Sequence, residues 1–377
     1  MNFERTEEQQ LLAESIRRFV ERDYDFEARG AIVASREGWS RDVWNSFAEL
    51  GLLGLSLPAE YGGFDGNAID QMGVMEAIGE ALIVEPYLST LVGARLVARA
   101  GSPAQRRRIL PAIAEGRLRM AFAHTESEGR YDLGHVATRA HEVEGGFVLD
   151  GEKRATLDAP CSDLLVVSAR LGGGVRDRDG IALFIIDPAL PGVSLRSLRT
   201  LDARRAADIT FDGARIDRDA RIAAPDGLAL MDEVVDYAIA LLCAEAVGAI
   251  RYANAATLEY LKTRKQFGVP IGSFQALQHR MVDMTIEYEQ AKSMAALACA
   301  TVDGETDALR RVHVVSGAKV RIADACRRVS QEAVQLHGGI GMSDELKVSH
   351  TFRRLTMIAQ EYGDADHHLE RFGATEA

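Results

Sequence analysis

The residue types best suited to binding a ligand lie between positions 263 and 280, in the run TRKQFGVPIGSFQALQHR. Arg264 offers a planar guanidinium of fixed charge, which matches the geometry of a pyrophosphate. Phe267 offers an aromatic face for a purine ring. Gln275 and Gln278 stand near the start of an expected helix, where their amides and the helix N-terminus favour sugar or phosphate oxygens. The run therefore suits a dinucleotide.

A purely structural interpretation of the same run stays open. Gly268 can end one helix, Pro270 can prevent its continuation, and Phe267 can belong to the core.

The run AVQLHGGIGMSDEL, residues 333 to 346, is the second candidate for ligand contact. Its paired glycines, Gly338 and Gly339, can cap the C-terminus of a helix through a left-handed residue. Paired glycines can also let the backbone approach a ligand closely. Taken alone, the cap is the simpler interpretation.

Three segments of different pattern must position these runs. Residues 1–118 are helical, with a capping box at Thr6 and Gln9 and another helix start at Ser102. In residues 119–222 the hydrophobic period falls towards two, and short runs between Gly, Asp and Pro predict an antiparallel sheet or barrel. Residues 223–377 return to long helices. We therefore expect an α+β fold of three domains with these boundaries.

One helix of the last segment shows its packing in the sequence. Apolar residues recur at alternating spacings of four and three, which is the seam of a helix in a bundle. These residues are Leu277, Met281, Met284, Tyr288, Ala291 and Ala295.

Composition excludes several classes of protein. The 377 residues carry a net charge of −12, which disfavours nucleic acid and anionic membrane surfaces as partners. No apolar run is long enough to span a bilayer, and the first residues do not read as a signal peptide. We expect a cytoplasmic protein with reduced, mostly buried thiols. The cysteines are Cys161, Cys243, Cys299 and Cys326.

We expect no metal site. The adjacent His367 and His368 would point in different directions on a helix, and no third ligand stands nearby in the sequence.

Five runs, in this order, resemble those of the acyl-CoA dehydrogenases over essentially the whole chain: WNSFAELGLLGLSLPAEYGG, AFAHTE, GGFVLDGEK, TRKQFGVPIGSFQALQHR and AVQLHGGIGMSDEL. The resemblance implies an N-terminal helical domain, a middle antiparallel β-barrel and a C-terminal four-helix bundle. It also implies an FAD-dependent oxidoreductase acting on acyl-CoA, with an electron-transferring flavoprotein as acceptor.

The resemblance assigns the opening run to FAD. Arg264 and Phe267 would hold the pyrophosphate and adenine of a neighbouring subunit's FAD, with Gln275 in support. Gln335, Gly338 and Gly339 would line the same cofactor. Because no single chain completes such a site, a homo- or hetero-oligomer, dimer or tetramer, is implied.

The base of the family reaction is missing from its usual places. In that reaction a Glu carboxylate removes the α-proton of the acyl-CoA while the β-hydrogen leaves as hydride to the flavin. Counted from the paired glycines, the base position falls on Tyr362, and Glu361 lies one residue early. A tyrosine, with an ordinary pKa of about 10, is a poor base at neutral pH. The alternative position falls near Ala238, where Asp236 is expected to be a charge on the helix face.

The middle segment departs from the family as well. The run TESEGRYD stands where the family wraps the flavin and CoA, and it keeps Thr125 but has Arg130–Tyr131 in place of Gly-Ser. The run ATL, residues 155–157, replaces a Trp-Ile-Thr that lies against the flavin ring. A flavin held only here would lose its aromatic wall and a hydroxyl contact.

Three hypotheses follow. The pattern resembles the small subunits of two-subunit acyl-CoA dehydrogenases, such as pimeloyl-CoA dehydrogenase and the steroid side-chain enzymes, so the first is a subunit that lacks the usual Glu and works with a second acyl-CoA dehydrogenase chain. The second is a self-sufficient homo-oligomer that uses Glu361 as base. The third is a flavin-free acyl-CoA-binding or structural partner.

Overall fold

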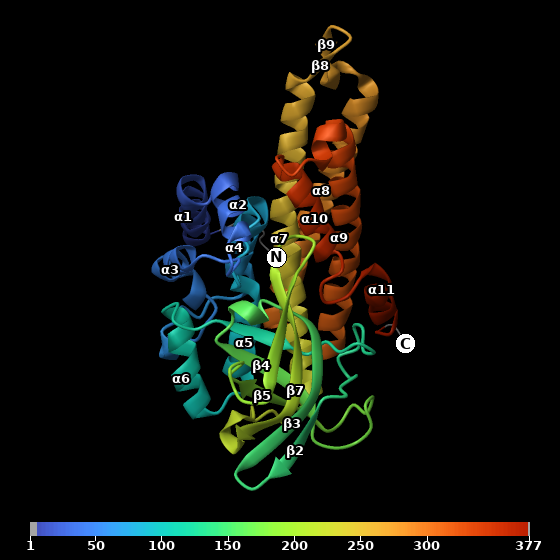
Figure 1. Ribbon diagram of the computed structural model, residues 1–377. Coiled ribbons are helices and arrows are strands. Elements are labelled where there is room, and N and C mark those ends of the chain that lie inside the picture. The colour runs from blue at the N-terminus through green and yellow to red at the C-terminus, as the bar shows by residue number, and fades with distance from the viewer. Residues whose placement is uncertain (1–5, 376–377) are drawn as a thin grey trace. The chain divides into compact units, whose positions relative to one another are not determined.

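The computed structural model describes residues 6–375, whose helices and strands are labelled in Figure 1. Its chain divides into two compact units. The bundle unit consists of the described residues of Met1–Arg29, Ala68–Ile83 and Ile239–Ala377. The sheet unit consists of Gly30–Asn67 and Val84–Ala238.

The N-terminal helices begin where the sequence predicts. Thr6 and Gln9 form the expected capping box, in which each side chain accepts a hydrogen bond from the other residue's backbone N–H. Ser102 caps the last of these helices, with Pro103 at its first position. The helices are α1 (Glu7–Asp23), α2 (Phe26–Ala34), α3 (Arg41–Glu49), α4 (Ala68–Ala81), α5 (Tyr87–Ala100) and α6 (Pro103–Ala114).

The sheet unit contains one mixed sheet. Its strands are β1 (Met120–Ala123), β2 (Arg139–Val143), β3 (Gly146–Leu157), β4 (Leu164–Arg170), β5 (Ile181–Ile186), β6 (Val193–Arg199) and β7 (Arg205–Asp217). Most pairs are antiparallel, as predicted, but β1 runs parallel to β4 and a single parallel pair joins β2 to β4. The hydrogen-bonded order is β1-β4-β2-β3-β7-β6, with β5 on the other edge of β4. Among the described strands no pairing joins β5 to β6. The expected α+β order of helical, β and helical segments is confirmed.

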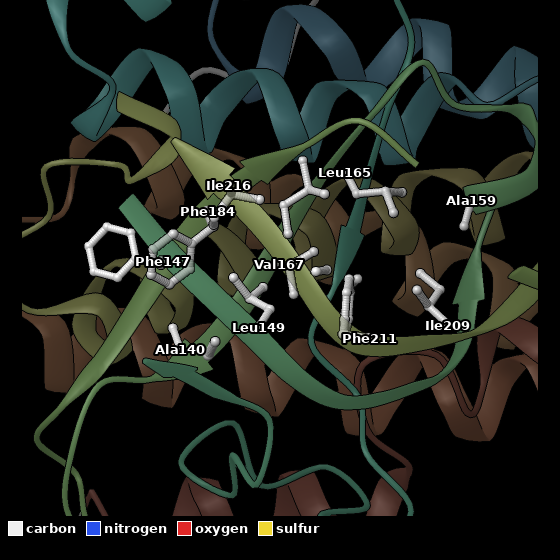
Figure 2. Packing of buried hydrophobic residues seen from close by; sticks show 14 of the residues in the cluster. Ala140, Phe147, Leu149, Ala159, Leu165, Val167, Phe184, Ile209, Phe211 and Ile216 are labelled. Atoms are coloured by element: carbon white, nitrogen blue, oxygen red, sulfur yellow. The ribbon is translucent and has the colours of Figure 1, made fainter. Parts of the chain in front are cut away.

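Alternating apolar residues of the strands explain the core of this sheet. Phe147 and Phe184 meet edge to face, with ring centroids 5.1 Å apart, and Leu165, Val167 and Phe211 pack in the same cluster (Figure 2). The cluster is buried on one face of the sheet, where strand periodicity places every second residue.

The C-terminal helices confirm the predicted seam at four of its six residues. Met281, Met284, Ala291 and Ala295 are buried along α8, whereas Leu277 and Tyr288 are half-buried. The helices are α7 (Gly227–Thr263), α8 (Gln275–Gly304), α9 (Ala308–His337), α10 (Lys347–Ile358) and α11 (Ala365–Gly373). All four cysteines are unbridged and buried, as expected. No helix in residues 6–375 is long and apolar enough to cross a membrane.

Helices α4 and α7 approach so closely that glycine is required on both. A Cβ added to Gly248 of α7 would lie 1.8 Å from the carbonyl oxygen of Glu76, and one added to Gly79 of α4 would lie 1.9 Å from that of Glu245. Both obstacles are backbone atoms, which cannot move without shifting a helix. The crossing therefore fixes where Glu245 lies in the bundle unit.

We predict that Gly248→Ala lowers the free energy of unfolding by about 1–3 kcal/mol, because the new methyl group forces the two backbones apart. Chemical denaturation measures the change. Gly30→Ala is the matched control, since Gly30 lies in α2 with no atom within 4 Å of an added Cβ, and alanine there should be neutral or stabilising. Equal effects of the two changes would contradict the close crossing.

Candidate functional site

The run that contains Phe267 forms a hairpin at the end of α7 and α8 (Figure 1). The two-residue strands β8 (Lys265–Gln266) and β9 (Val269–Pro270) pair antiparallel. Phe267 and Gly268 join them with φ of 53° and 82°, so both central residues are left-handed, as in a type I′ turn. Helix α7 has already ended at Thr263, so Gly268 does not end it.

The side chain of Phe267 projects into solvent. It is 92% exposed, so its assignment to the core is wrong. A left-handed conformation costs a bulky L-residue about 1–2 kcal/mol, and no buried contact of the ring offsets that cost. Its neighbour is Phe274, which lies edge-on with the ring centroids 6.3 Å apart. The ring of Phe267 is therefore accessible to a ligand or to another chain.

The start of α8 lies directly after the hairpin. Gln275 is the first residue of α8 and is exposed, and the preceding Phe274 gives the helix no side-chain cap. The first N–H groups of a helix have no intrahelical acceptor, so this end favours an anion. The side-chain amide of Gln278 instead donates a hydrogen bond to the carbonyl of Gly272 at 2.9 Å, within the connection that precedes α8.

The paired glycines end α9. Gly338 has a positive φ of 67°, which favours glycine, and its N–H donates to the carbonyl of Gln335, so it caps the helix without the expected left-handed helical conformation. Gln335, Gly338 and Gly339 are all exposed, and a Cβ added to either glycine would meet no atom within 4 Å. The surface is open along this backbone.

A ring contact brings the two runs together. Tyr260, one turn before Arg264 in α7, stacks on His337 at the end of α9 with the centroids 4.5 Å apart. The Arg264 N–H donates to the Tyr260 carbonyl at 2.8 Å. The exposed Arg264 and the glycines after His337 therefore belong to the same end of the bundle unit.

An apolar pocket of about 590 Å³ lies beside the hairpin, between α7 and α8. Leu258, Val282 and Ile286 of its lining are 41%, 55% and 48% exposed. Large apolar side chains gathered on a surface are typical of a protein interface.

Glu361 lies in a buried ion-pair cluster. Arg354 of α10 donates to both carboxylate oxygens of Glu245, at 2.6 and 2.9 Å, and to Glu361 at 2.6 Å. All three side chains are at most 8% exposed. Glu361 and Glu245 together compensate the charge of the buried guanidinium. The contacts suit a residue that fixes the loop between α10 and α11.

Tyr362 follows in the same loop with a left-handed backbone, φ 56°. His368, buried in α11, lies with its Nε2 3.1 Å from the Tyr362 carbonyl and its Nδ1 3.3 Å from Ser316 Oγ. Burial, and secondarily Lys319, lowers the pKa of His368 to about 3. The neutral imidazole thus holds the loop that presents Tyr362.

The sheet unit contains the remaining candidates. Thr125 is half-buried after β1, and its carbonyl accepts the N–H of Arg154 at 2.8 Å. Ala155 is left-handed, and the pairing of β3 with β7 shifts between Lys153 and Thr156. Within the described part of the chain, the buried hydroxyl of Thr156 has no hydrogen-bond partner.

The alternative base position contains no carboxylate. Ala238 of α7 is buried, and so is Asp236, which is 0% exposed. Asp236 is not a charge on the helix face, because every residue from 234 to 250 of α7 is buried.

Backbone strain marks the candidate segments, a signal that the sequence does not carry. Left-handed residues other than glycine cluster at functional positions, where surrounding structure imposes them. Four of the eight described here fall in the hairpin, the Tyr362 loop, the TESEGRYD run or the ATL run of residues 155–157. The eight are Asp65, Leu82, Arg130, Ala155, Asp158, Ala203, Phe267 and Tyr362.

His367 and His368 lie with their rings edge to face, 5.0 Å apart. Across the described range 6–375, no three His, Cys, Asp or Glu side chains gather in a group that could hold a metal ion.

Sequence profiles of three acyl-CoA dehydrogenase domains match the chain. The N-terminal profile matches residues 6–117, the middle profile 121–214 and the C-terminal profile 225–374. A similar relative is acyl-CoA dehydrogenase FadE12 of Mycobacterium tuberculosis (strain ATCC 25618 / H37Rv), 30% identical over 334 residues, or 86% of each chain.

Two solved structures share the fold over almost the full length. A Tcur3481-Tcur3483 steroid ACAD variant is 29% identical with a TM-score of 0.88 and covers 98% of each chain. The FAD complex of PigA is 25% identical with a TM-score of 0.91 and covers 100% of this chain and 99% of that one.

We predict that Phe267→Asn leaves the melting temperature unchanged or raises it, because asparagine tolerates the left-handed turn and Phe267 has no core contact to lose. Scanning calorimetry provides the measurement. The same change at the fully buried Phe47 should lower the melting temperature strongly. A comparable loss at Phe267 would show that its ring supports the fold.

A pH dependence follows from His368. Its pKa is about 3 in the folded chain against an ordinary 6.5, so folding favours the neutral ring. This contribution is complete above about pH 6.5 and is lost as the pH falls towards 3. Denaturation midpoints of His368→Asn should therefore fall less steeply between pH 6.5 and 4 than those of the wild type. Parallel pH profiles would contradict a buried neutral His368.

Proposed function

Since this chain belongs to the acyl-CoA dehydrogenase family, we propose that it is one subunit of a heteromeric FAD-dependent enzyme that oxidises the CH–CH bond of an acyl-CoA. It is an FAD-dependent oxidoreductase by family. In the proposal this chain contributes contacts to an FAD whose flavin ring is bound by a partner chain. That partner chain also supplies the catalytic base.

The single observation that carries the proposal is the exposed, strained Phe267 beside Arg264. Phe267 is 92% exposed in a turn that disfavours its side chain, which fits a ring that stacks on an adenine. Arg264 and the uncapped start of α8 at Gln275 fit the pyrophosphate. Gln335 and the open glycines Gly338 and Gly339 leave room for the same cofactor. When bound, FAD supplies the hydride acceptor.

The chain's own catalytic half fits a self-sufficient enzyme less well. Tyr362 takes the base position, and Glu361 is held by Arg354 in a buried ion pair. Ala155 and Leu157 stand where the family resemblance places an aromatic wall and a hydroxyl, although Thr125 stays available to the flavin. These substitutions support an enzyme in which a second chain supplies the catalytic base and the wall of the flavin site.

The partner is proposed to be a second acyl-CoA dehydrogenase chain. The apolar surface of Leu258, Val282 and Ile286 beside the hairpin is suited to an interface. The solved Tcur3481-Tcur3483 steroid ACAD, which is named for two components, supports such an assembly. We extend the proposal to the class of small subunits such as that of pimeloyl-CoA dehydrogenase, with an electron-transferring flavoprotein as acceptor.

The proposal predicts that Arg264→Ala and Phe267→Ala each reduce the amount of FAD bound to the mixed assembly, and that the double variant loses most of it. Stacking of an aromatic ring on a base and a charged hydrogen bond each contribute on the order of 1–3 kcal/mol to binding. Flavin absorbance per assembly, after gel filtration, measures the loss. Matched controls are Lys265→Ala, an exposed cation of the same hairpin, and Leu309→Ala, which removes an apolar side chain 63% exposed elsewhere. Full flavin content in the double variant would exclude the proposed role of the hairpin.

Glu361→Gln separates this proposal from a homo-oligomer that uses Glu361 as base. Here we expect turnover within a few-fold of the wild type and a loss of about 1–3 kcal/mol in stability, because Arg354 loses one charged partner. A catalytic base would instead cost roughly 10²–10⁴ in kcat. A loss of that size with flavin retained would favour the homo-oligomer, whereas no flavin in any assembly would favour the flavin-free alternative.

A further inference from the structure

The connection between the paired glycines and α10 is hydrogen-bonded on both sides. We call residues 343–346 the 343–346 connection. At its start, the N–H of Ser343 donates to the carbonyl of Ile340, inside the turn that contains the paired glycines, at 3.1 Å. One residue later, the carbonyl oxygen of Asp344 lies 2.9 Å from Nε2 of His350, near the start of α10. A side chain of α10 is therefore linked to the glycine turn through one short connection.

The other ring nitrogen of His350 faces a buried guanidinium. Arg29 of α2 is 3% exposed, and its Nη1 lies 3.3 Å from Nδ1 of His350. The Nε of Arg29 donates to the carbonyl of Leu82, just after α4, at 2.7 Å, so the guanidinium is fixed from its other side. Phe26 packs edge to face on the imidazole, with the ring centroids 5.0 Å apart. The His350 imidazole thus joins α2 to the 343–346 connection, within the bundle unit.

The two partners of His350 determine its protonation state. A guanidinium can only donate, so Nδ1 must accept at the contact with Arg29 and carries no proton. A carbonyl oxygen can only accept, so Nε2 must carry the proton at the contact with Asp344. The tautomer follows from these partners, and the ring is neutral.

The charged groups that face His350 disfavour a second proton. Burial lowers the pKa of the ring from its ordinary 6.5. Arg29 of α2 and Arg353 of α10 lower that pKa further, whereas Asp344 acts in the opposite direction through its carbonyl and its exposed carboxylate. A proton on Nδ1 would place a second positive charge beside Arg29 and remove the acceptor that Arg29 uses.

The same part of the bundle unit already contains other cations. Burial lowers the pKa of Lys347, the first residue of α10, to about 8, with Glu80 of α4 acting against this shift and Arg29 in its favour. The ammonium of Lys347 is therefore still mostly protonated at pH 7. Glu80 is also paired with Arg251 of α7 at 2.5 Å, so its negative charge is shared. A protonated His350 would add one more positive charge between α2 and α10.

We propose that His350 is a pH switch, which holds the 343–346 connection and the paired glycines in place only while its ring is neutral. The inference rests on the proposed function, in which Gly338 and Gly339 line the FAD of the mixed assembly. Because Nδ1 can take a proton only after it leaves Arg29, protonation favours the state in which this contact is broken. The stabilising contact is therefore complete above about pH 6.5 and is lost as the pH falls. FAD should then leave the assembly more readily.

The first test is the pKa of His350 in the full chain, from the NMR titration of its ring protons. The ring is assigned through its contact with Phe26, so this measurement needs no variant. We expect a pKa below 6.5, and a value at or above 6.5 would overturn the switch.

Two variants that cannot titrate separate the roles of the two ring nitrogens. His350→Asn keeps an oxygen that can accept from Arg29, and His350→Gln keeps an amide that can donate to the carbonyl of Asp344. The matched control is His141→Gln, at an exposed histidine of β2.

Hydrogen exchange of the chain without FAD compares these variants, with amide rates of residues 343–350 corrected for the intrinsic rate at each pH. We expect wild type and His141→Gln to exchange about threefold or more faster at about pH 5.5 than at about pH 7.5. His350→Asn should change little between the two conditions, and His350→Gln should exchange fast in both. A wild-type rate that does not depend on pH would overturn the switch.

The affinity of the mixed assembly for FAD links the switch to the proposed function. In wild type and His141→Gln the Kd of FAD should rise about threefold or more from about pH 7.5 to about pH 5.5, and in His350→Asn by less than about twofold. His368 does not affect this comparison, because its pKa of about 3 keeps it neutral throughout. An equal rise in every variant would overturn the switch and leave the proposed function intact. An assembly that binds no FAD at about pH 7.5 would overturn the proposed function, while the titration and the exchange rates still decide whether His350 acts as a switch.

Discussion

The bundle unit depends on one guanidinium that is shared by two buried carboxylates. Arg354 of α10 binds Glu245 of α7 and Glu361 of the loop before α11, so a single buried cation fixes two helices and a loop. Glu245 can lie there because glycines allow α4 and α7 to meet backbone to backbone. Removing either carboxylate would leave part of the positive charge of the buried Arg354 without a compensating negative charge, which is destabilising. The same constraint that stabilises the bundle holds the Glu361 carboxylate against Arg354.

Strain and exposure divide the candidate site into two halves of different character. At the hairpin, a phenylalanine is kept in a left-handed turn and fully presented to solvent, which stability alone does not explain. At the Tyr362 loop, the strained residue is a poor base, and its neighbours hold it through buried contacts. The first half exposes an aromatic ring beside an uncapped helix start, and in the second the nearby carboxylate of Glu361 is ion-paired with Arg354. A chain with that combination is suited to completing another chain's site.

Much of the fold could be predicted because its signals are local. The capping box at Thr6 needs only neighbouring residues, and the buried seam of α8 follows from helical period. The cluster of Arg354 and Glu245 could not be predicted, since the partners are 109 residues apart and leave no periodic pattern. The sequence predicts Asp236 on an exposed helix face, but α7 is buried on all sides at that position, so it has no solvent-exposed face there. Phe-Gly, unlike Asn-Gly, is not a sequence signal for a type I′ turn. The exposed position of Phe267 therefore could not be predicted from the sequence and is seen only in the backbone conformation of the turn.

The central claim is that this chain is half of a flavin site. The most direct measurement is the flavin-to-chain ratio, from the visible absorption spectrum, of the chain purified alone and again after co-purification with a second acyl-CoA dehydrogenase chain that carries an intact aromatic wall and base Glu. The account predicts little or no flavin in the chain alone and a stable yellow complex with the partner. About one flavin per chain in the isolated protein would contradict it, and would mean that the altered sheet unit still holds a flavin of its own.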